Sequence, residues 1–88
     1  MRFRFSGTLL RFTDFQKEIQ VQAPTLGEAL VHLVSQHERL KPVLLDNNER
    51  LRGIHRLFLN GEQLLEVQPQ QPLADGDCLE FVTAVAGG

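Results

Sequence analysis

Apolar and polar residues alternate along the first quarter of the chain, and this pattern predicts strands. Residues 2–12 alternate strictly at first and then continue as an apolar run after Ser6-Gly7. A period of two is typical of a half-buried strand, and a glycine inside such a run indicates a bulge or bend. After a turn over residues 13–16, the same alternation returns in residues 17–23. We therefore expect the chain to begin with a β-hairpin.

The spacing of apolar residues then changes from strand-like to helical. Pro24 ends the second strand, and Thr25 followed by Glu28 has the spacing of a capping box, in which the threonine side chain accepts a hydrogen bond from the glutamate amide. The sequence predicts a helix from there to about Glu38, with one apolar face that packs against the sheet. That face is formed by Leu26, Ala29, Leu30, Leu33 and Val34.

The middle of the chain has no long periodic segment. Residues 40–52 contain Pro42 and a polar stretch, so we expect a connecting loop that its apolar residues hold in place. A third strand is predicted over residues 54–59. It ends at Asn60-Gly61, which is a strong signal for a two-residue hairpin turn.

Two further strands complete the predicted sheet. A short fourth strand is expected over residues 63–65, followed by an irregular crossover that contains Pro69 and Pro72. The last strand should run from Cys78 to about Ala84. One amphipathic helix and one half-buried sheet predict a two-layer α+β domain.

Alternation within the last and third strands predicts which side chains lie on the open face of the sheet. Leu79 and Phe81 should face the helix, so Val82 turns outward. In the third strand Leu57 and Leu59 should face the helix, so Phe58 turns outward. Phe58 and Val82 would then lie near each other, and an exposed apolar pair is suited to bind a partner protein. In the alternative interpretation, residues 40–52 cover Phe58.

Length and charge exclude several classes of protein. The chain has 88 residues and a net charge of −2, and its basic residues are scattered between Arg2 and Arg56. A nucleic-acid-binding protein would concentrate such residues on one face. No apolar stretch reaches the ~18 residues of a membrane-spanning helix, and the N-terminus lacks a signal-peptide core. We therefore expect a single soluble, cytoplasmic domain that binds neither nucleic acid nor a membrane.

Few residues offer catalytic or ligand-binding chemistry. Cys78 is the only cysteine, which excludes an internal disulfide, and we expect it to be a small core residue in a reducing compartment. His32 and His37 would project about 140° apart around a helix, so we expect no metal site and place the three histidines, including His55, at the surface or its boundary. No phosphate-binding loop, catalytic triad or acid pair is evident. The chain is therefore not expected to be an enzyme.

The chain ends in Gly87-Gly88, directly after the apolar residues Ala84, Val85 and Ala86. Glycine has no Cβ, so two glycines can lie extended in a channel that is too narrow for other residues. Most chain ends fray without a role. The ending is therefore informative only together with other motifs.

Three motifs in order supply that context. Residues 59–62 (Leu-Asn-Gly-Glu), 72–77 (Pro-Leu-Ala-Asp-Gly-Asp) and 84–88 (Ala-Val-Ala-Gly-Gly) have the order and spacing of the MoaD/ThiS family of sulfur carriers, which the chain resembles over nearly its whole length. The resemblance implies a β-grasp (ubiquitin-like) fold, with a mixed sheet of about four to five strands packed on one main helix. It also implies a β-grasp domain over residues 1–83 and a flexible diglycine tail over residues 84–88. Residues 44–52 look like the loop of longer members, including the carriers that feed cysteine synthesis.

The resemblance also implies a chemistry for the tail. A separate adenylyltransferase/sulfurtransferase, similar to ubiquitin-activating enzymes, would use ATP to adenylate Gly88, and sulfur would then displace AMP to leave a thiocarboxylate. A downstream synthase would accept the sulfur, and this chain would bind no cofactor and no metal. Gly87 and Gly88 would form the reactive site. The expected partner-binding residues are Phe58, Val82, Ala84, Val85 and Ala86.

Several functions stay open at this point. The sulfur would be used to make cysteine or another sulfur-containing metabolite, and molybdopterin, a siderophore or a thiolated nucleoside are further possible acceptors. One alternative is the small subunit of molybdopterin synthase. An alternative of another class is a ubiquitin-like modifier conjugated through Gly88, and a third is an interaction module with an inert tail.

Overall fold

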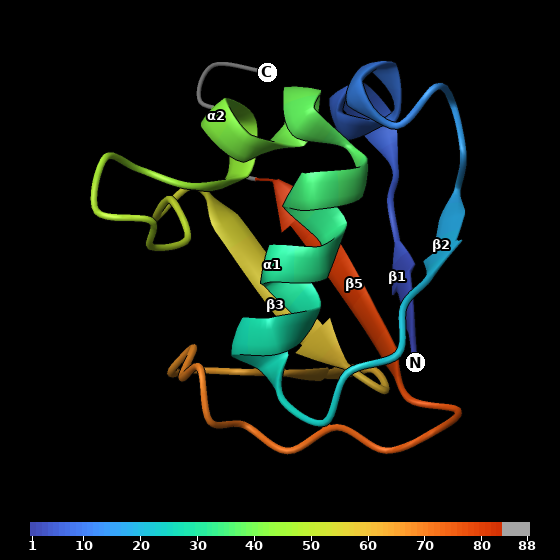
Figure 1. Ribbon diagram of the computed structural model, residues 1–88, viewed down its shortest axis with the longest axis vertical. Coiled ribbons are helices and arrows are strands. Elements are labelled where there is room, and N and C mark those ends of the chain that lie inside the picture. The colour runs from blue at the N-terminus through green and yellow to red at the C-terminus, as the bar shows by residue number, and fades with distance from the viewer. Residues whose placement is uncertain (84–88) are drawn as a thin grey trace.

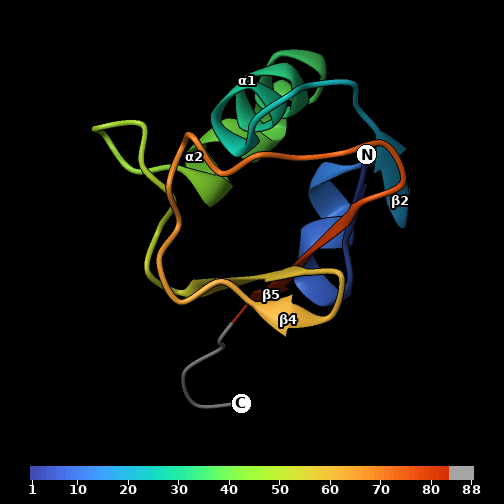
Figure 2. The same ribbon diagram turned by 90° about the horizontal axis from the view of Figure 1, so that it is seen from below.

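A computed structural model describes residues 1–83, which form a five-stranded sheet in the order β2-β1-β5-β3-β4. Helix α1 (Leu26–Gln36) lies across β3 and β5 (Figure 1). Figure 2 shows α1 and the short helix α2 (Lys41–Leu44) together on one side of the sheet. The other side of the sheet carries no α-helix from residues 1–83. This arrangement confirms the predicted two-layer α+β domain of the β-grasp type.

The sheet is mixed, and β5 is its central strand. β1 (Arg2–Arg4) pairs in parallel with β5 (Cys78–Thr83). The other neighbours pair antiparallel: β2 (Glu18–Gln20) with β1, β3 (His55–Leu59) with β5, and β4 (Glu62–Gln63) with β3. The last described strand therefore carries the chain towards its C-terminus through the middle of the sheet.

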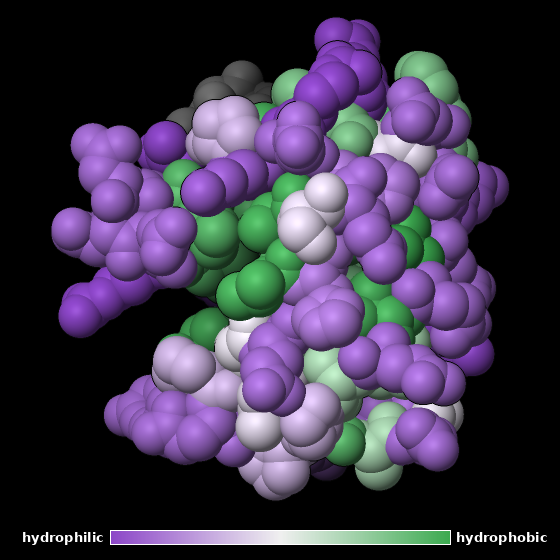
Figure 3. Space-filling model, viewed as in Figure 1, coloured by the Kyte–Doolittle hydropathy of each residue, from purple (hydrophilic) through white to green (hydrophobic). Residues whose placement is uncertain are grey.

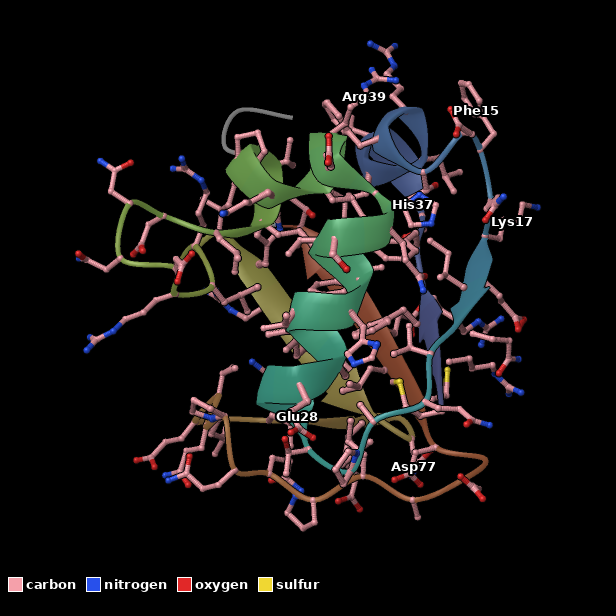
Figure 4. All side chains as sticks on the ribbon, in the orientation of Figure 1. Phe15, Lys17, Glu28, His37, Arg39 and Asp77 are labelled. Atoms are coloured by element: carbon pink, nitrogen blue, oxygen red, sulfur yellow. The ribbon has the colours of Figure 1, made fainter. Side chains whose placement is uncertain are left out.

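Helix α1 begins at the predicted capping box. The Thr25 side chain accepts a hydrogen bond from the Glu28 amide at 3.4 Å, and Glu28 lies at the N-terminal end of the helix (Figure 4). The helix ends at Gln36, slightly before the predicted end, and the 3-10 turn η2 (Glu38–Leu40) follows. Its apolar face packs against the sheet, and Leu26, Ala29 and Leu33 are completely buried.

The core between α1 and the sheet is centred on three phenylalanines. The ring of Phe81 stacks on Phe3 and Phe5, with centroids 5.7 Å and 5.3 Å away. Leu57 and Leu79 complete this layer and have no exposed surface. The inward positions predicted for β3 and β5 are thus confirmed at Leu57, Leu79 and Phe81. Burial of these side chains is the main favourable contribution to folding, at roughly 25 cal/mol for each Å² of apolar surface.

The first strand is shorter than predicted. β1 ends at Arg4, and Gly7–Phe12 forms a 3-10 helix, η1, where an extended strand was expected. Gly7 has a φ of +62°, a left-handed conformation that interrupts an extended run and is accessible to glycine. The turn directs Leu9 into the core, where it is 2% exposed. The prediction of one strand over residues 2–12 is therefore wrong beyond Arg4.

Residues 40–52 are also more ordered than the predicted loop. They contain α2, with Pro42 in its first turn. The missing N–H of proline costs nothing at this position, because the first amides of a helix have no intrahelical partner. Leu40 and Leu44 on either side of Pro42 are completely buried. The proline therefore lies at the start of a short helix, where a connecting loop was expected from the sequence.

The Asn60-Gly61 turn is confirmed and the fourth strand is shorter than expected. Asn60 and Gly61 have φ values of +51° and +88°, as a two-residue turn between antiparallel strands requires. β4 ends at Gln63, and Leu65 beyond it is 88% exposed. The predicted strand over residues 63–65 is thus correct only at its first residue.

Candidate functional site

The reactive end expected from the sequence lies outside the described residues. Gly87, Gly88 and the range 84–86 belong to that part of the chain, so the structure describes the point from which they extend. That point is Thr83, the last residue of β5, which pairs with His55 at the start of β3. The expected site is therefore built on the end of the central strand.

Thr83 is held by a buried histidine. The Nδ1 atom of His55 lies 3.0 Å from Thr83 Oγ1, and its Nε2 atom lies 2.8 Å from the carbonyl oxygen of Val43 in α2. A carbonyl oxygen only accepts hydrogen bonds, so Nε2 carries the proton that it donates to Val43, and in the neutral ring Nδ1 accepts from the Thr83 hydroxyl. The imidazole also meets the ring of Phe81 edge-on, with centroids 6.4 Å apart. One side chain thus links α2, the core and the end of β5.

This role of His55 was missed by the sequence analysis, which placed all three histidines at the surface or its boundary. His55 is only 4% exposed. The signal was present in the alternation of β3, because His55 has the same parity as Leu57, which was correctly assigned to the inner face. A histidine among inward-facing residues needs hydrogen-bond partners, and Val43 and Thr83 provide them.

The beginning of β5 is fixed by two of the motifs on which the family resemblance was based. Asn60 in the hairpin turn donates from Nδ2 to Asp77 Oδ1 at 3.0 Å, and its Oδ1 accepts from the Cys78 amide at 3.0 Å. The other oxygen of Asp77 accepts from the Ala74 amide at 2.8 Å. Asp77 lies in the segment that leads into β5 (Figure 4). The hydrogen bonds from Ala74 and Asn60 lower the pKa of Asp77 below its ordinary value.

The open face of the sheet carries the apolar pair expected from the sequence. Phe58 lies opposite Glu80, and Val82 lies opposite Arg56, so the two apolar side chains are diagonal neighbours on adjacent strands. Val82 is 42% exposed, and Phe58 is half-buried. Their cross-strand partners, Glu80 and Arg56, are both charged.

Residues 40–52 do not cover Phe58. Figures 1 and 2 show that this segment lies on the same side of the sheet as α1. Its members Leu45 and Leu51 line a groove together with α1 residues. Phe58 points to the opposite side, because its neighbour Leu57 is buried under the helix. The alternative interpretation of Phe58 is therefore not supported by the fold.

Cys78 does not lie where the sequence analysis expected it. It is half-buried at the start of β5, on the open face, because Leu79 next to it faces the core. Among residues 1–83, no group of three or more histidine, cysteine, aspartate or glutamate side chains is placed to hold a metal ion. Within the same residues, no helix has the length and apolar character needed to cross a membrane.

Comparison with known proteins connects this geometry with a family. The sequence profile of the ThiS family matches residues 3–88. No curated protein sequence matches the chain. Several solved structures share its fold, and three of them are described next.

The first of these structures is SAMP1, small archaeal modifier protein 1, from Haloferax volcanii, with a TM-score of 0.85, 23% identity, and coverage of 99% of this chain and 97% of that chain. The BexX/CysO complex of Amycolatopsis orientalis gives a TM-score of 0.84 at 25% identity, with coverage of 99% of this chain and 98% of that chain. The complex of subunits 1 and 2 of the molybdopterin-converting factor from Helicobacter pylori 26695 gives a TM-score of 0.63 at 24% identity, with coverage of 99% of this chain and 96% of that chain. All three share the β-grasp fold with this chain, and two of them were solved as complexes with a partner protein.

Proposed function

Because the chain belongs to the ThiS family, we propose that it is a sulfur carrier whose C-terminal Gly88 is adenylated and converted to a thiocarboxylate. Carriers of this family are non-catalytic substrates of adenylating enzymes that resemble ubiquitin-activating enzymes. The observation that carries the proposal is the extent of the family match, which continues through Gly87 to the last residue. The thiocarboxylate would then donate its sulfur in a biosynthetic pathway.

The chemistry begins with a poor electrophile. The carboxyl group at a chain end has an ordinary pKa of about 3.3 to 3.7, so it is ionised at neutral pH and must be activated before sulfur can attack. In the activating enzyme, a Gly88 carboxylate oxygen attacks the α-phosphate of ATP and pyrophosphate leaves. Sulfide then attacks the acyl carbon and AMP leaves, which gives the thiocarboxylate. If a persulfide attacks instead, a second thiol must reduce the resulting acyl disulfide.

The number of residues in the tail sets how far Gly88 can reach from the folded domain. Residues 84–88 in extended conformation span about 16 to 18 Å. That length allows Gly88 to enter an active site while the folded domain binds outside. The partner would contact Ala84, Val85 and Ala86 along the tail, and Phe58 and Val82 on the open face of the sheet.

Two other functions are favoured by particular relatives. The likeness to a subunit of the molybdopterin-converting factor favours the small subunit of molybdopterin synthase as an alternative. The likeness to a small archaeal modifier protein favours a modifier conjugated through Gly88. The loop over residues 44–52 and the likeness to CysO lead us to prefer a carrier in the synthesis of cysteine or another sulfur-containing metabolite. This chemistry suits the reducing cytoplasm expected from the single cysteine.

Intact-mass measurement after reconstitution tests the proposal. The full chain is incubated with its cognate adenylating enzyme, ATP and sulfide. The expected product has the mass gain of one oxygen replaced by sulfur, and this gain should disappear when Gly88 is deleted. Attachment to lysines of other proteins under the same conditions would favour the modifier. A mass that stays unchanged, with no AMP adduct, would contradict any role of Gly88.

Gly87→Ala tests the requirement for an unhindered tail. An added Cβ should slow adenylation strongly in a narrow channel, while the unfolding midpoint stays that of the wild type. Pyrophosphate release by the adenylating enzyme measures the rate. A variant that is adenylated at the wild-type rate would show that the channel does not need glycine at this position.

A further inference from the structure

A large groove lies on the helix side of the sheet, away from the open face. It runs between α1, the edge formed by β3 and β4, and the segments 45–53 and 64–69, and its volume is about 1190 Å³. Figure 3 shows hydrophobic residues at the bottom of a hollow beside α1, between two projecting polar segments. Its apolar lining includes Leu30, Val31, Val34, Leu51, Leu64 and Leu65.

The apolar side chains of this groove are unusually exposed for so small a domain. Val31 is 64% exposed, Leu65 is 88% exposed and Val67 is 39% exposed. All three line the groove. Single exposed apolar residues are ordinary, but neighbouring ones around a concave surface are typical of a binding site. The groove therefore has the character of an interaction surface.

The charges at the border of the groove indicate what kind of partner fits. Four basic side chains line it against two acidic ones, Glu38 and Glu49, although the whole chain has a net charge of −2. Lys41 and Glu49 form an ion pair at 3.5 Å. Arg56 pairs with Val82 in the sheet and has the parity of the open face, so the basic side chains that remain at the groove are Arg50 and Arg52, against Glu38.

One of these arginines is fixed along the border by a backbone carbonyl. Arg52 Nε donates to the Pro42 oxygen at 3.0 Å. A guanidinium has five N–H donors, so Arg52 keeps donors for a further acceptor. Because such groups pair well with carboxylates, the border is complementary to acidic side chains.

We propose that this groove binds an acidic, amphipathic segment of a second partner protein. Apolar side chains of the segment would cover the groove lining, and its carboxylates would meet Arg50 and Arg52. The activating enzyme would meet the open face at Phe58 and Val82, and the groove lies on the other side of the sheet. The carrier can therefore bind both proteins at the same time, which goes beyond the proposed transfer chemistry and does not depend on it.

Binding of matched model peptides tests the proposal directly. Capped synthetic peptides of repeated Glu-Leu-Leu-Glu and Lys-Leu-Leu-Lys units are titrated into the full-length, isotope-labelled chain, and amide chemical shifts are followed by NMR. The acidic peptide should shift the amides of Val31, Leu51 and Leu65. The acidic peptide should bind at least about tenfold more tightly than the basic peptide. Added salt should weaken binding of the acidic peptide, because the ion pairs are at the surface.

Variants locate the site. Val31→Glu and Leu65→Glu change exposed positions, so the domain should stay folded, and each should weaken the acidic peptide severalfold or more. The same change on the open face, Val82→Glu, should leave binding as in the wild type. Thermal unfolding of each variant verifies the fold independently.

Four outcomes would overturn the proposal. If neither peptide causes chemical-shift changes, the groove does not bind such peptides. If the changes occur on the open face, the peptide binds there and not in the groove. Equal affinity for both peptides contradicts the assignment of an acidic partner. Groove shifts that depend on protein concentration without peptide would identify a second copy of this chain as the occupant.

Discussion

At the scale of single residues, side chains fasten β5 at both ends. Asn60 and Asp77 bind at its start, where they satisfy backbone amides of the turn and the strand. His55 binds Thr83 at its end. Because β5 leads into the tail, these contacts determine where the proposed reactive end leaves the domain and how firmly its base is held.

The contact between His55 and Thr83 predicts a measurable coupling. Thr83→Val removes one hydrogen bond and should lower the free energy of unfolding by about 1 kcal/mol, whereas His55→Phe also leaves the Val43 carbonyl without its donor and should cost about 2 to 4 kcal/mol. Because the two residues contact each other, the double variant should cost less than the sum of the single ones. Urea unfolding of the four proteins measures this cycle. Strict additivity would mean that the two side chains do not interact in solution.

Asp77 predicts the sign of a pH dependence. Its hydrogen bonds from Ala74 and Asn60 lower its pKa in the folded state, so it stabilises the fold at neutral pH, and this contribution is lost as the pH falls below about 4, the ordinary pKa of an aspartate. In Asp77→Asn only one side-chain oxygen remains to accept a hydrogen bond, so this variant should be less stable than the wild type at pH 7. The difference should shrink on acidification.

Thermal unfolding midpoints between neutral pH and about pH 3 measure this effect of Asp77. Asp46 provides a matched comparison, because amides of Arg50 and Asn48 bind its carboxylate and lower its pKa in the same way. Both amides bind the same oxygen of Asp46, Oδ1, which asparagine keeps, so Asp46→Asn should cost less stability at pH 7 than Asp77→Asn and converge with the wild type in the same direction. A gap that widens on acidification would contradict the assigned direction of both pKa shifts.

At the scale of elements, the start of α1 and residues 69–71 stabilise each other. The amides of Leu26 and Gly27 donate to the oxygens of Gln71 and Pro69 at 2.9 Å and 2.8 Å. These are amides that a helix cannot satisfy internally. The irregular crossover therefore acts as a cap for α1, and it also forms one wall of the groove.

Gly27 is needed for this close approach. A Cβ at this position would lie 2.9 Å from Pro69 Cβ and 3.1 Å from the Pro69 oxygen. Gly27→Ala should therefore reduce the free energy of unfolding by about 1 to 3 kcal/mol, although alanine favours a helix by up to about 1 kcal/mol. Denaturant unfolding measures this change in the free energy of unfolding. Gly53→Ala is the control, because no atom lies within 4 Å of its added Cβ. If Gly27→Ala is more stable than the wild type, the crossover can move away from the added Cβ at little cost.

The elements that the sequence predicted correctly are those with local chemistry. The Thr25 cap and the Asn60-Gly61 turn depend on a few adjacent residues, so their signals can be read directly. Gly7 and Pro42 were ambiguous, since a glycine after a strand can make a bulge or end it, and a proline can break or start a helix. Tertiary burial of their leucine neighbours decided both cases.

The candidate site was predictable only in part for the same reason. The outward positions of Phe58 and Val82 follow from strand parity, which the sequence contains. The link from His55 to Val43 joins residues 12 positions apart, and the link to Thr83 joins residues 28 apart. Such contacts depend on how α2 packs over β3, and no local pattern encodes that packing.

At the scale of the whole molecule, the domain has two different sides. The open face carries Phe58 and Val82 beside the end of β5, and the helix side carries the groove. Since the sheet separates them, a substitution on one side should not disturb binding on the other. This separation gives the most direct test of where the activating enzyme binds.

Phe58→Asp and Leu65→Asp place the same charge on opposite sides of the sheet. Phe58→Asp should raise KM for adenylation by the cognate enzyme about tenfold or more, because it puts a carboxylate into an apolar contact, and the unfolding midpoint should change little since Phe58 lies outside the buried core. Leu65→Asp, at an 88% exposed position, should be adenylated like the wild type. Steady-state pyrophosphate release and thermal unfolding measure both variants. Unfolding of Phe58→Asp would mean that this side chain serves the core, and slow adenylation of Leu65→Asp alone would place the enzyme on the helix side.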